Sequence, residues 1–427
     1  YIARDADVAA DENVKVAAES AQNVVAVGAS FGGAGAAAVS AAAEVNVVAN
    51  VTEAFIGASR DDADKSTGAT VDSDGNVSVS AVDDTLVVAL SAVGNGAGAA
   101  AVGGIVGANV ITSQTRAYVS ENSAVNARGG AAGTEVYSGS IADATAAQKP
   151  PAVPGGGSGD IDIDRDGVTD GNVGNGAVLD VKTGEGTQST VNPGAAKDAD
   201  GNPIAGASGG LGTKGTETVK GLSVLAMGNE KIVTATIGVA GAGAAAVTGA
   251  ATANVIASET EASIKDGAQI NMSGATGTDA AVRVRAADNT FMVQAGGTVT
   301  GAGAAAVSGT VNTGIVAKKT TARIGDADVK ASDVEVTADS SEKIFTLTAN
   351  VSIAGAAGVG AGVGVNVIAN ETSAGIGAGA NIDATGDIDV EASQNSLLNI
   401  NTVAVAGGIA GVGGAFSVGV IANKTKA

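Results

Sequence analysis

The chain contains no cysteine, no histidine and no tryptophan among its 427 residues. Without cysteine it cannot form a disulfide, and its redox compartment cannot be inferred from thiol content. Without histidine it cannot assemble a Ser/His/Asp or Cys/His catalytic set, and the usual zinc sites are excluded. Because these absences remove the commonest catalytic machineries, we expect a protein that is not an enzyme.

Aromatic residues and positive charges are also scarce. Aromatics are 2% of the chain, so Gly, Ala, Val and Thr must fill the interior, and such residues suit closely stacked backbone layers. The 23 basic residues are outnumbered by 44 acidic ones, which gives a net charge of −21. This charge argues against nucleic acid or an anionic membrane as a partner and favours a soluble surface or secreted protein.

Proline is confined to one segment, because all five prolines lie between Thr115 and Leu222. Proline cannot donate to a β-ladder, so the proline-free regions on either side can form continuous sheets. These regions repeat one phrase six times: a Gly/Ala-rich apolar run, a short β-branched stretch, then Thr-x-Ala. The aligned threonines are Thr52, Thr115, Thr260, Thr320, Thr372 and Thr425.

A second motif is linked to this phrase, a short alternating segment such as Val77-x-Val79-x-Ala81. Apolar residues at a period of two predict a half-buried strand. Turn signals such as Asp74-Gly75-Asn76 precede the motif, and no long 3.6-residue period is present. Its copies begin at Val14, Val77, Leu222, Val282, Val334 and Ile388.

Repeated strands and turns predict an all-β fold, a repetitive β-solenoid. We expect a single-chain right-handed parallel β-helix with a Val/Ile/Ala interior and one inserted module. The repeat holds roughly 50–60 residues and a β-helix coil roughly 20–25, so we expect two or more coils per repeat. At ~4.8 Å per coil, about 15 coils would make a rod about 70 Å long.

The spacing of the motifs also predicts the domain organisation. The distance from Thr115 to the next alternating segment at Leu222 is several times that in any other repeat. We therefore expect solenoid repeats over 1–129 and 221–427, and an inserted Pro/Gly/Asp-rich module over 130–220. An insertion in one repeat maps to the side of a solenoid, where we expect ligand contact.

The inserted module contains the strongest local motif in the chain. Aspartates alternate before Gly167, as oxygen ligands do in a calcium loop, but Val173 stands where an EF-hand has its glutamate. A calcium site and a solvated acidic turn both remain open, and calcium is the one cofactor that the sequence suggests. The candidate ligands are Asp160, Asp162, Asp164, Asp166 and Asp170.

Asparagines recur at two positions of the repeat. Stacked asparagines can form hydrogen-bonded ladders, so we expect a structural role, although the second set also matches the glycosylation sequon. The first set is Asn46, Asn109, Asn254 and Asn366, and the second is Asn50, Asn370 and Asn423.

Several acidic pairs allow a catalytic interpretation. Asp61-Asp62 and Asp83-Asp84 suggest the paired carboxylates of β-helix enzymes that act on polysaccharides, but their turn-like neighbours favour a structural role. Asp72-Ser73-Asp74-Gly75 predicts a hairpin turn.

The uncharged stretch Ile232–Ser258 is long enough to span a membrane, yet it lacks leucine and positive flanks. We expect it to form a flat face of small residues instead of a membrane span. Such a face can pack against a neighbour, so lateral self-association is one expected interaction.

The Gly/Ala run at 301–309 and the phrase at 366–374 resemble the repeats of very large bacterial surface exoproteins. These are filamentous, haemagglutinin-like and autotransporter-type adhesins, including leukotoxin-family filamentous adhesins. The resemblance covers about 1–125 and 221–427. It implies a right-handed β-helix that projects a binding tip from the cell, and hence a stalk or filament segment at the bacterial surface or outside the cell, with an unknown surface ligand.

The two ends of the chain suggest an alternative. The chain stops at Thr425-Lys426-Ala427, midway through the phrase, and Tyr1 begins within one. Either it is a slice of a longer array, or copies join head to tail as subunits of a self-assembling extracellular fibre.

Overall fold

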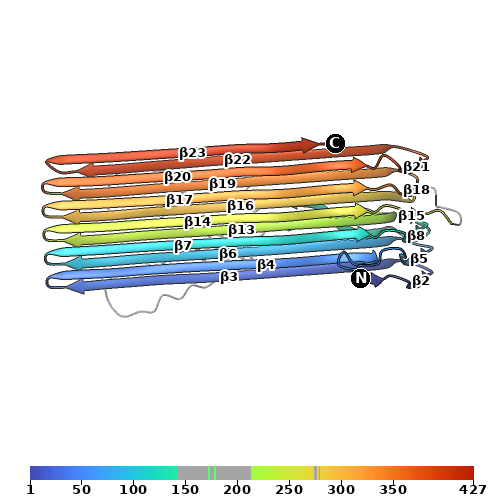
Figure 1. Cartoon of the computed structure of the whole chain (residues 1–427), viewed down its shortest axis with the longest axis horizontal. Helices are drawn as coiled ribbons and strands as arrows, with labels where there is room; N and C mark the ends of the chain where they lie inside the picture. The colour runs from blue at the N-terminus through green and yellow to red at the C-terminus, as the bar shows by residue number, and fades with distance from the viewer. Residues whose placement is uncertain (143–171, 174–176, 179–212, 274–276, 278) are drawn as a thin grey trace, which may run out of the picture.

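A computed structural model describes residues 1–142, 172–173, 177–178, 213–273, 277 and 279–427. Its strands stack as six coils, each with one short strand and two long strands that run in opposite directions (Figure 1). In one coil these are β5 (Thr70–Ser73), β6 (Val77–Ala97) and β7 (Ala100–Val119). Figure 1 shows the tight reversals at the left end and the short strands at the right end. We call these the reversal end and the closed end.

Corresponding strands of successive coils pair in parallel and build three sheets. Sheet A contains β1 (Ile2–Ala3), β4 (Ala37–Gly57), β7, β14 (Ala245–Ile264), β17 (Ala305–Ile324), β20 (Ala357–Ile376) and β23 (Ala410–Lys426). Sheet C contains β3 (Val14–Ala34), β6, β13 (Gly221–Ala242), β16 (Ala281–Ala302), β19 (Val334–Ala354) and β22 (Ile388–Gly407). Sheet B, at the closed end, contains β2 (Asp7–Ala10), β5, β8 (Ala124–Ala127), β15 (Gln269–Ile270), β18 (Asp328–Ala331) and β21 (Asn381–Ala384). The predicted all-β, parallel solenoid is confirmed.

The predicted number of coils is wrong, because each repeat forms one coil. The Gly/Ala run does not separate short strands. It forms one reversal, at Gly243-Ala244, between strands of 22 and 20 residues. A strand of this length spans about 70 Å, whereas six coils stack to only about 30 Å. The long axis of the molecule therefore runs along the strands, not along the stack (Figure 1).

The register of the repeats follows the sequence motifs. Thr52 pairs with Thr115, and the same column continues through the other aligned threonines to Thr425. The alternating segments align in the same way in sheet C, where Val77 lies beside Val14 and Leu222. Each motif therefore marks the same position in every coil, the threonine motif in sheet A and the alternating motif in sheet C.

Glycine is required at the reversal because successive coils approach closely there. A Cβ on Gly243 would overlap the carbonyl oxygen of Gly98, and a Cβ on Gly303 would overlap that of Gly243. The amide of Gly243 donates to Ala97 O at 3.2 Å, so the reversals are hydrogen-bonded from coil to coil like the strands. A side chain at Gly98, Gly243, Gly303 or Gly355 would therefore force the coils apart.

The interior is apolar only in part. At the closed end, Val79, Val119 and Ile264 belong to one buried cluster that all three sheets enclose, as predicted. A narrow second band includes Ile232 and Ile256. Much of the remaining space between sheets A and C is filled by buried polar side chains, among them Thr234, Thr236, Thr252, Asn254, Asn312, Thr348 and Asn350. The predicted Val/Ile/Ala interior is therefore wrong over much of the flat part of the solenoid.

The described flanks of the long insertion leave the solenoid between β8 and β13. β9 (Thr134–Ala142) and β12 (Thr213–Val219) pair as an antiparallel ribbon, with Val136 opposite Glu217. Two short strands, β10 (Asn172–Val173) and β11 (Ala177–Val178), form a second antiparallel pair. The insertion therefore enters and leaves at a corner of one coil, between sheets B and C.

Candidate functional site

The five candidate calcium ligands, Asp160, Asp162, Asp164, Asp166 and Asp170, lie outside the described residues. Within the part of the chain that the structure describes, no three acidic side chains gather in a way that could hold a metal ion. The calcium prediction therefore stays a prediction.

The acidic pairs lie in structural positions. Asp62 accepts a hydrogen bond from the amide of Ser59 at 2.8 Å and closes a local turn. Asp83 is buried between the sheets, whereas Asp84, on the opposite face of β6, pairs with Lys214. Alternation along a strand thus separates the two carboxylates of this pair.

The Asp72–Gly75 turn is not a hairpin. It lies at the corner between β5 in sheet B and β6 in sheet C. Arg128 pairs with Asp72 at 2.5 Å and with Asp74 at 2.7 Å. The hairpin prediction is wrong because, in a solenoid, the segments before and after such a turn belong to different sheets.

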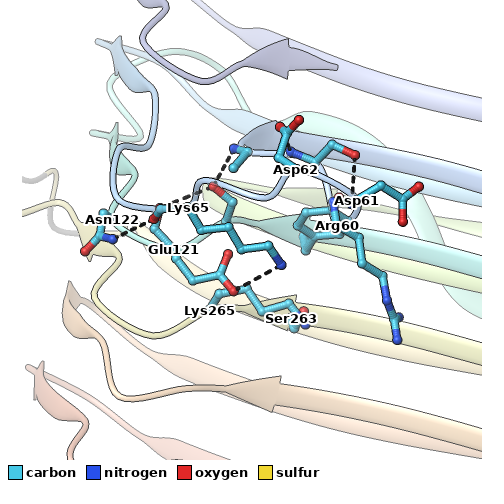
Figure 2. Close-up of polar contacts among 12 residues, drawn as sticks. Arg60, Asp61, Asp62, Lys65, Glu121, Asn122, Ser263 and Lys265 are labelled. Carbon is cyan, nitrogen blue, oxygen red and sulfur yellow. Dashed lines mark hydrogen bonds and ion pairs between the residues drawn. The ribbon is translucent and has the colours of Figure 1, made fainter.

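A loop between β4 and β5 covers part of sheet A at the closed end. Its Arg60 amide donates to the Tyr118 hydroxyl at 2.9 Å, and the Arg60 guanidinium lies 3.6 Å from Glu261. Lys65 lies 3.8 Å from Glu121, and the Lys65 carbonyl accepts a hydrogen bond from Asn122 (Figure 2). The loop and its partners are polar and charged, like the outward side chains of sheet A near the closed end, where Arg116 pairs with Glu53 and Glu259.

Three aromatic rings form a column beside this loop. Tyr1 stacks on Phe55 with ring centroids 4.9 Å apart, and Phe55 stacks on Tyr118 at 5.2 Å. The Lys265 ammonium lies 5.7 Å from the centroid of the Tyr118 ring. The column and the loop are in contact, because the Arg60 amide donates to the Tyr118 hydroxyl. Together they link the first two coils at the closed end.

The first asparagine ladder is confirmed in three coils. Asn46 Nδ2 donates to Asn109 Oδ1 at 2.8 Å, and Asn109 Nδ2 donates to Asn254 Oδ1 at 2.7 Å. In the next coil Gly314 takes the place of asparagine, and a Cβ there would overlap the amide of Gln294. Gln294 occupies this space and donates to Asn366 at 3.1 Å.

The second set of asparagines does not form a ladder. Asn50 contacts Asp83, Asn370 accepts from the amide of Lys318, and Asn423 donates to Ser396. The ladder predicted here is wrong, because Ser113, Ser258 and Lys318 fill the intervening positions of the column.

A layer of charged side chains is buried between sheets A and C, and sequence reasoning did not find it. Lys318 of β17 points inward, with its ammonium 2.9 Å from Glu230 and paired with Asp288. All three side chains are fully buried. Asp83 and Glu342 are buried on the same face of sheet C. We call Asp83, Glu230, Asp288, Lys318 and Glu342 the charged layer.

Burial controls protonation in the charged layer. Desolvation, reinforced by the nearby Glu230, raises the pKa of Asp288, although Lys318 opposes the rise. The two carboxylates raise the pKa of Lys318 despite its burial. One buried ammonium thus faces two buried carboxylates. In β6, near the start of the stack, burial and the nearby Glu230 raise the pKa of Asp83 to about 6.

The outer face of sheet A is apolar from the reversal to the middle of each strand. Val39 is 75% exposed, Val47 is 67% exposed and Phe416 is 60% exposed. The outward positions from the Ala245 column to the Ala257 column carry no charged side chain in any coil. Since large exposed apolar faces are common at interaction sites, this face is the candidate interaction surface of the molecule.

A groove of about 610 Å³ crosses this face along the stack. It follows a column of small residues, Ala49, Thr112, Ala257, Ala317 and Ala369, and Glu259 and Lys319 lie on the side towards the closed end. The floor of the groove offers mainly alanine methyl groups, which suit an apolar ridge, and its polar side chains lie towards the closed end.

No family model, no curated protein and no solved structure matches this chain. In the described residues, no helix has the length and apolar character needed to cross a membrane.

Proposed function

We propose that this chain is a non-enzymatic structural segment, a stalk or filament, of a bacterial cell-surface or secreted adhesin. The observation that supports the proposal most directly is the unbroken register of the coils. The β14 strand pairs with β7 and β17 over all 20 of its residues, so backbone hydrogen bonds continue along the stack. Such ladders make each coil a template for the next and suit an elongated support.

A second candidate function is an extracellular fibre whose copies join end to end. Beside β4, the strand β1 fills only two positions, opposite Ile56 and Gly57, so most of the β4 edge is unpaired. β23 has the matching register for that place, since its aligned threonine is Thr425. A further copy or a further coil of a longer protein would complete the edge equally well.

Electron microscopy of the purified chain distinguishes these functions. Discrete particles about 70 Å along the strands and about 30 Å along the stack are expected for a stalk segment. Fibres of indefinite length would instead support end-to-end assembly. Compact globules would contradict both proposals.

The same grids prepared with calcium and then with chelator test the calcium site. If Asp160, Asp162, Asp164, Asp166 and Asp170 bind calcium, we expect the chelator to alter the particles. Identical particles in both conditions would mean that calcium has no role in the structure of the particle.

A further inference from the structure

The outer face of sheet A has a regular relief that repeats in every coil. One ridge is valine in all six coils, and a second ridge is valine or isoleucine. Each ridge has a groove of small residues beside it on the side towards the closed end. The ridges are the Val247 column (Val39, Val102, Val247, Val307, Val359, Val412) and the Val255 column (Val47, Val110, Val255, Ile315, Val367, Val420). The grooves are the Gly249 column (Ala41, Gly104, Gly249, Gly309, Ala361, Gly414) and the Ala257 column (Ala49, Thr112, Ala257, Ala317, Ala369, Ala422).

The fold itself does not require glycine in the Gly249 column. A Cβ added at Gly104, Gly249 or Gly414 would meet no atom within 4 Å. This contrasts with the reversal, where a Cβ on Gly243 would overlap the neighbouring coil. Glycine in a strand costs about 0.5–1 kcal/mol relative to alanine and often marks close approach by another backbone. The open glycines therefore indicate a body packed against this face from outside.

The spacing of the relief makes the face complementary to itself. The two ridges are eight residues apart along the strand, and so are the two grooves, so each set is separated by about 26 Å. When the face is turned over so that strand directions oppose, the Val247 ridge meets the Ala257 groove. The same rotation brings the Val255 ridge onto the Gly249 groove. Every ridge then has a groove, and the variable columns at Ala251 and Ala253 meet at the centre.

We propose that two copies of this chain pack face to face through sheet A, related by a two-fold axis parallel to the stack. In this dimer β14 of one copy faces β14 of the other with the strands antiparallel, and both stacks run in the same N-to-C direction. The inference develops the lateral self-association that the small-residue face of the sequence predicts, and it adds the face, the register and the symmetry. It does not depend on the adhesin assignment.

The area available is sufficient for a stable dimer. From the Val247 column to the Ala257 column the face measures about 36 Å by about 29 Å, or about 1,000 Å² per copy. A standard stable interface buries about 800 Å² per partner. The charged Glu259 column falls at the rim, opposite the Ala245 column near the reversal, so no charge needs to be buried. Interdigitated small and β-branched residues are the packing found between the dry faces of paired sheets.

The first test uses analytical ultracentrifugation of three variants of the full chain. Gly249→Val fills a groove and should raise the dimer dissociation constant about tenfold or more, because a ridge of the partner no longer fits. Gly301→Val is the matched control, since Gly301 also has no atom within 4 Å of an added Cβ but lies on sheet C. The swap Gly249→Val with Val255→Gly exchanges ridge and groove within β14 and should restore the dimer. Circular dichroism checks that all three variants fold.

The second test measures the register with single cysteines in the naturally cysteine-free chain. Thr313→Cys lies beside the two-fold axis, where the two copies of the residue would be about 12 Å apart, and a short bismaleimide should join them. Arg323→Cys lies in the same strand near the closed end, where the copies would be about 70 Å apart, and should not react across the dimer.

Four results would overturn the proposal. One is a monomer at all concentrations, and a second is a dimer that Gly249→Val and Gly301→Val weaken equally. A third is cross-linking through Arg323→Cys but not Thr313→Cys. The fourth is flotation of monomers with phosphatidylcholine vesicles, which would assign the apolar face to lipid. A monomeric particle of the expected dimensions would leave the stalk function standing, so the two proposals can fail separately.

Discussion

Lys318 is the one basic side chain of the charged layer, and it faces carboxylates from three different strands. Its ammonium pairs with Glu230 and Asp288, and the nearby charge of Glu342 also raises the pKa of Lys318. The partners cannot turn towards water, because their side chains are fully buried. Removing the ammonium would therefore leave buried carboxylates without compensation.

We expect Lys318→Met to lower the free energy of unfolding by about 3–5 kcal/mol, the cost of breaking a buried ion pair from one side. Lys319→Met is the control, since Lys319 points outward on the same strand and is 56% exposed. Its effect should stay below about 1 kcal/mol. The measurement is thermal unfolding followed by circular dichroism. Equal losses in the two variants would contradict the buried pair.

Replacing the whole group should be milder than replacing one member. Lys318→Met combined with Glu230→Gln and Asp288→Asn removes the charges together, so less destabilisation is expected than for Lys318→Met alone. The same thermal scans test this, and a triple variant less stable than the single one would exclude a charge origin.

Asp83 should make stability depend on pH. Its pKa is raised to about 6 by burial and by Glu230, so between about pH 4 and 6 the folded chain holds a proton that the unfolded chain has released. The free energy of unfolding should therefore fall as pH rises through this window and level off above it. Asp83→Asn should flatten this part of the curve, and Asp62→Asn, which changes an exposed turn, should not. Thermal midpoints between pH 4 and 8 provide the measurement.

At the scale of single elements, glycine occurs in two different environments. Gly243 lies where coils touch, whereas Gly249 lies on an open face of the next strand. We expect Gly243→Ala to destabilise the fold by about 1–3 kcal/mol through overpacking. Gly249→Ala should be neutral or stabilising by about 0.5–1 kcal/mol, and alanine already occupies this column in β4 and β20. Thermal unfolding of both variants checks the contrast, and a loss of stability in Gly249→Ala would show that the open face is constrained.

Side chains that face each other across sheets A and C also compensate for each other's size. Asparagine at the ladder position faces threonine in two coils, as Asn254 faces Thr234 and Asn366 faces Thr346. Glycine stands there where the facing side chain is larger, as Gly314 faces Gln294. The two sheets thus share one fixed space.

This relation predicts a rescue. Gly314→Asn alone should destabilise the fold by about 1–3 kcal/mol, because the new side chain overlaps Gln294 and Asn366. Adding Gln294→Thr recreates the Asn–Thr pair of the adjacent coils and should recover most of the loss. A double-mutant cycle on thermal unfolding measures the coupling, and additive effects would mean that the two positions do not share space.

The sequence predicted the class of fold and the register, but not the size of a coil. The aligned threonines and the Val77-x-Val79 motif mark true columns, because strand periodicity and the repeat report them together. Coil size was missed because a Gly/Ala run describes a reversal and a flat strand equally well. The charged layer was missed because Lys318 is a single exception in its column, and its partners lie on other strands. Only the facing of sheets A and C brings these groups together.

At the scale of the whole molecule, polarity is distributed unusually. The flat part encloses threonine, asparagine and charged groups, while its outer face on sheet A is apolar. The charged loop between β4 and β5 lies at the closed end (Figure 2), and the aromatic column lies beside it. Side-chain hydrogen bonds such as Asn46–Asn109 and Asn109–Asn254 link successive coils inside the solenoid, and the apolar exterior remains available for association. Stability then depends on stacking contacts between coils more than on a single central core.

A stack of equivalent coils should tolerate the loss of one whole coil. Deleting residues 357–409 joins Ala356 to Ala410, which takes the place of its ladder partner Ala357 and preserves every inward position of β23. Because each coil contacts only its neighbours, we expect the shortened chain to keep its strand signal per residue and to lose about 4.8 Å along the stack. Deleting Thr252 alone is the control, since a one-residue shift turns the inward side chains of β14 outward. Small-angle scattering and circular dichroism should show a folded, shorter particle for the coil deletion and a disrupted one for the single deletion. The opposite ranking would mean that the coils are not interchangeable units.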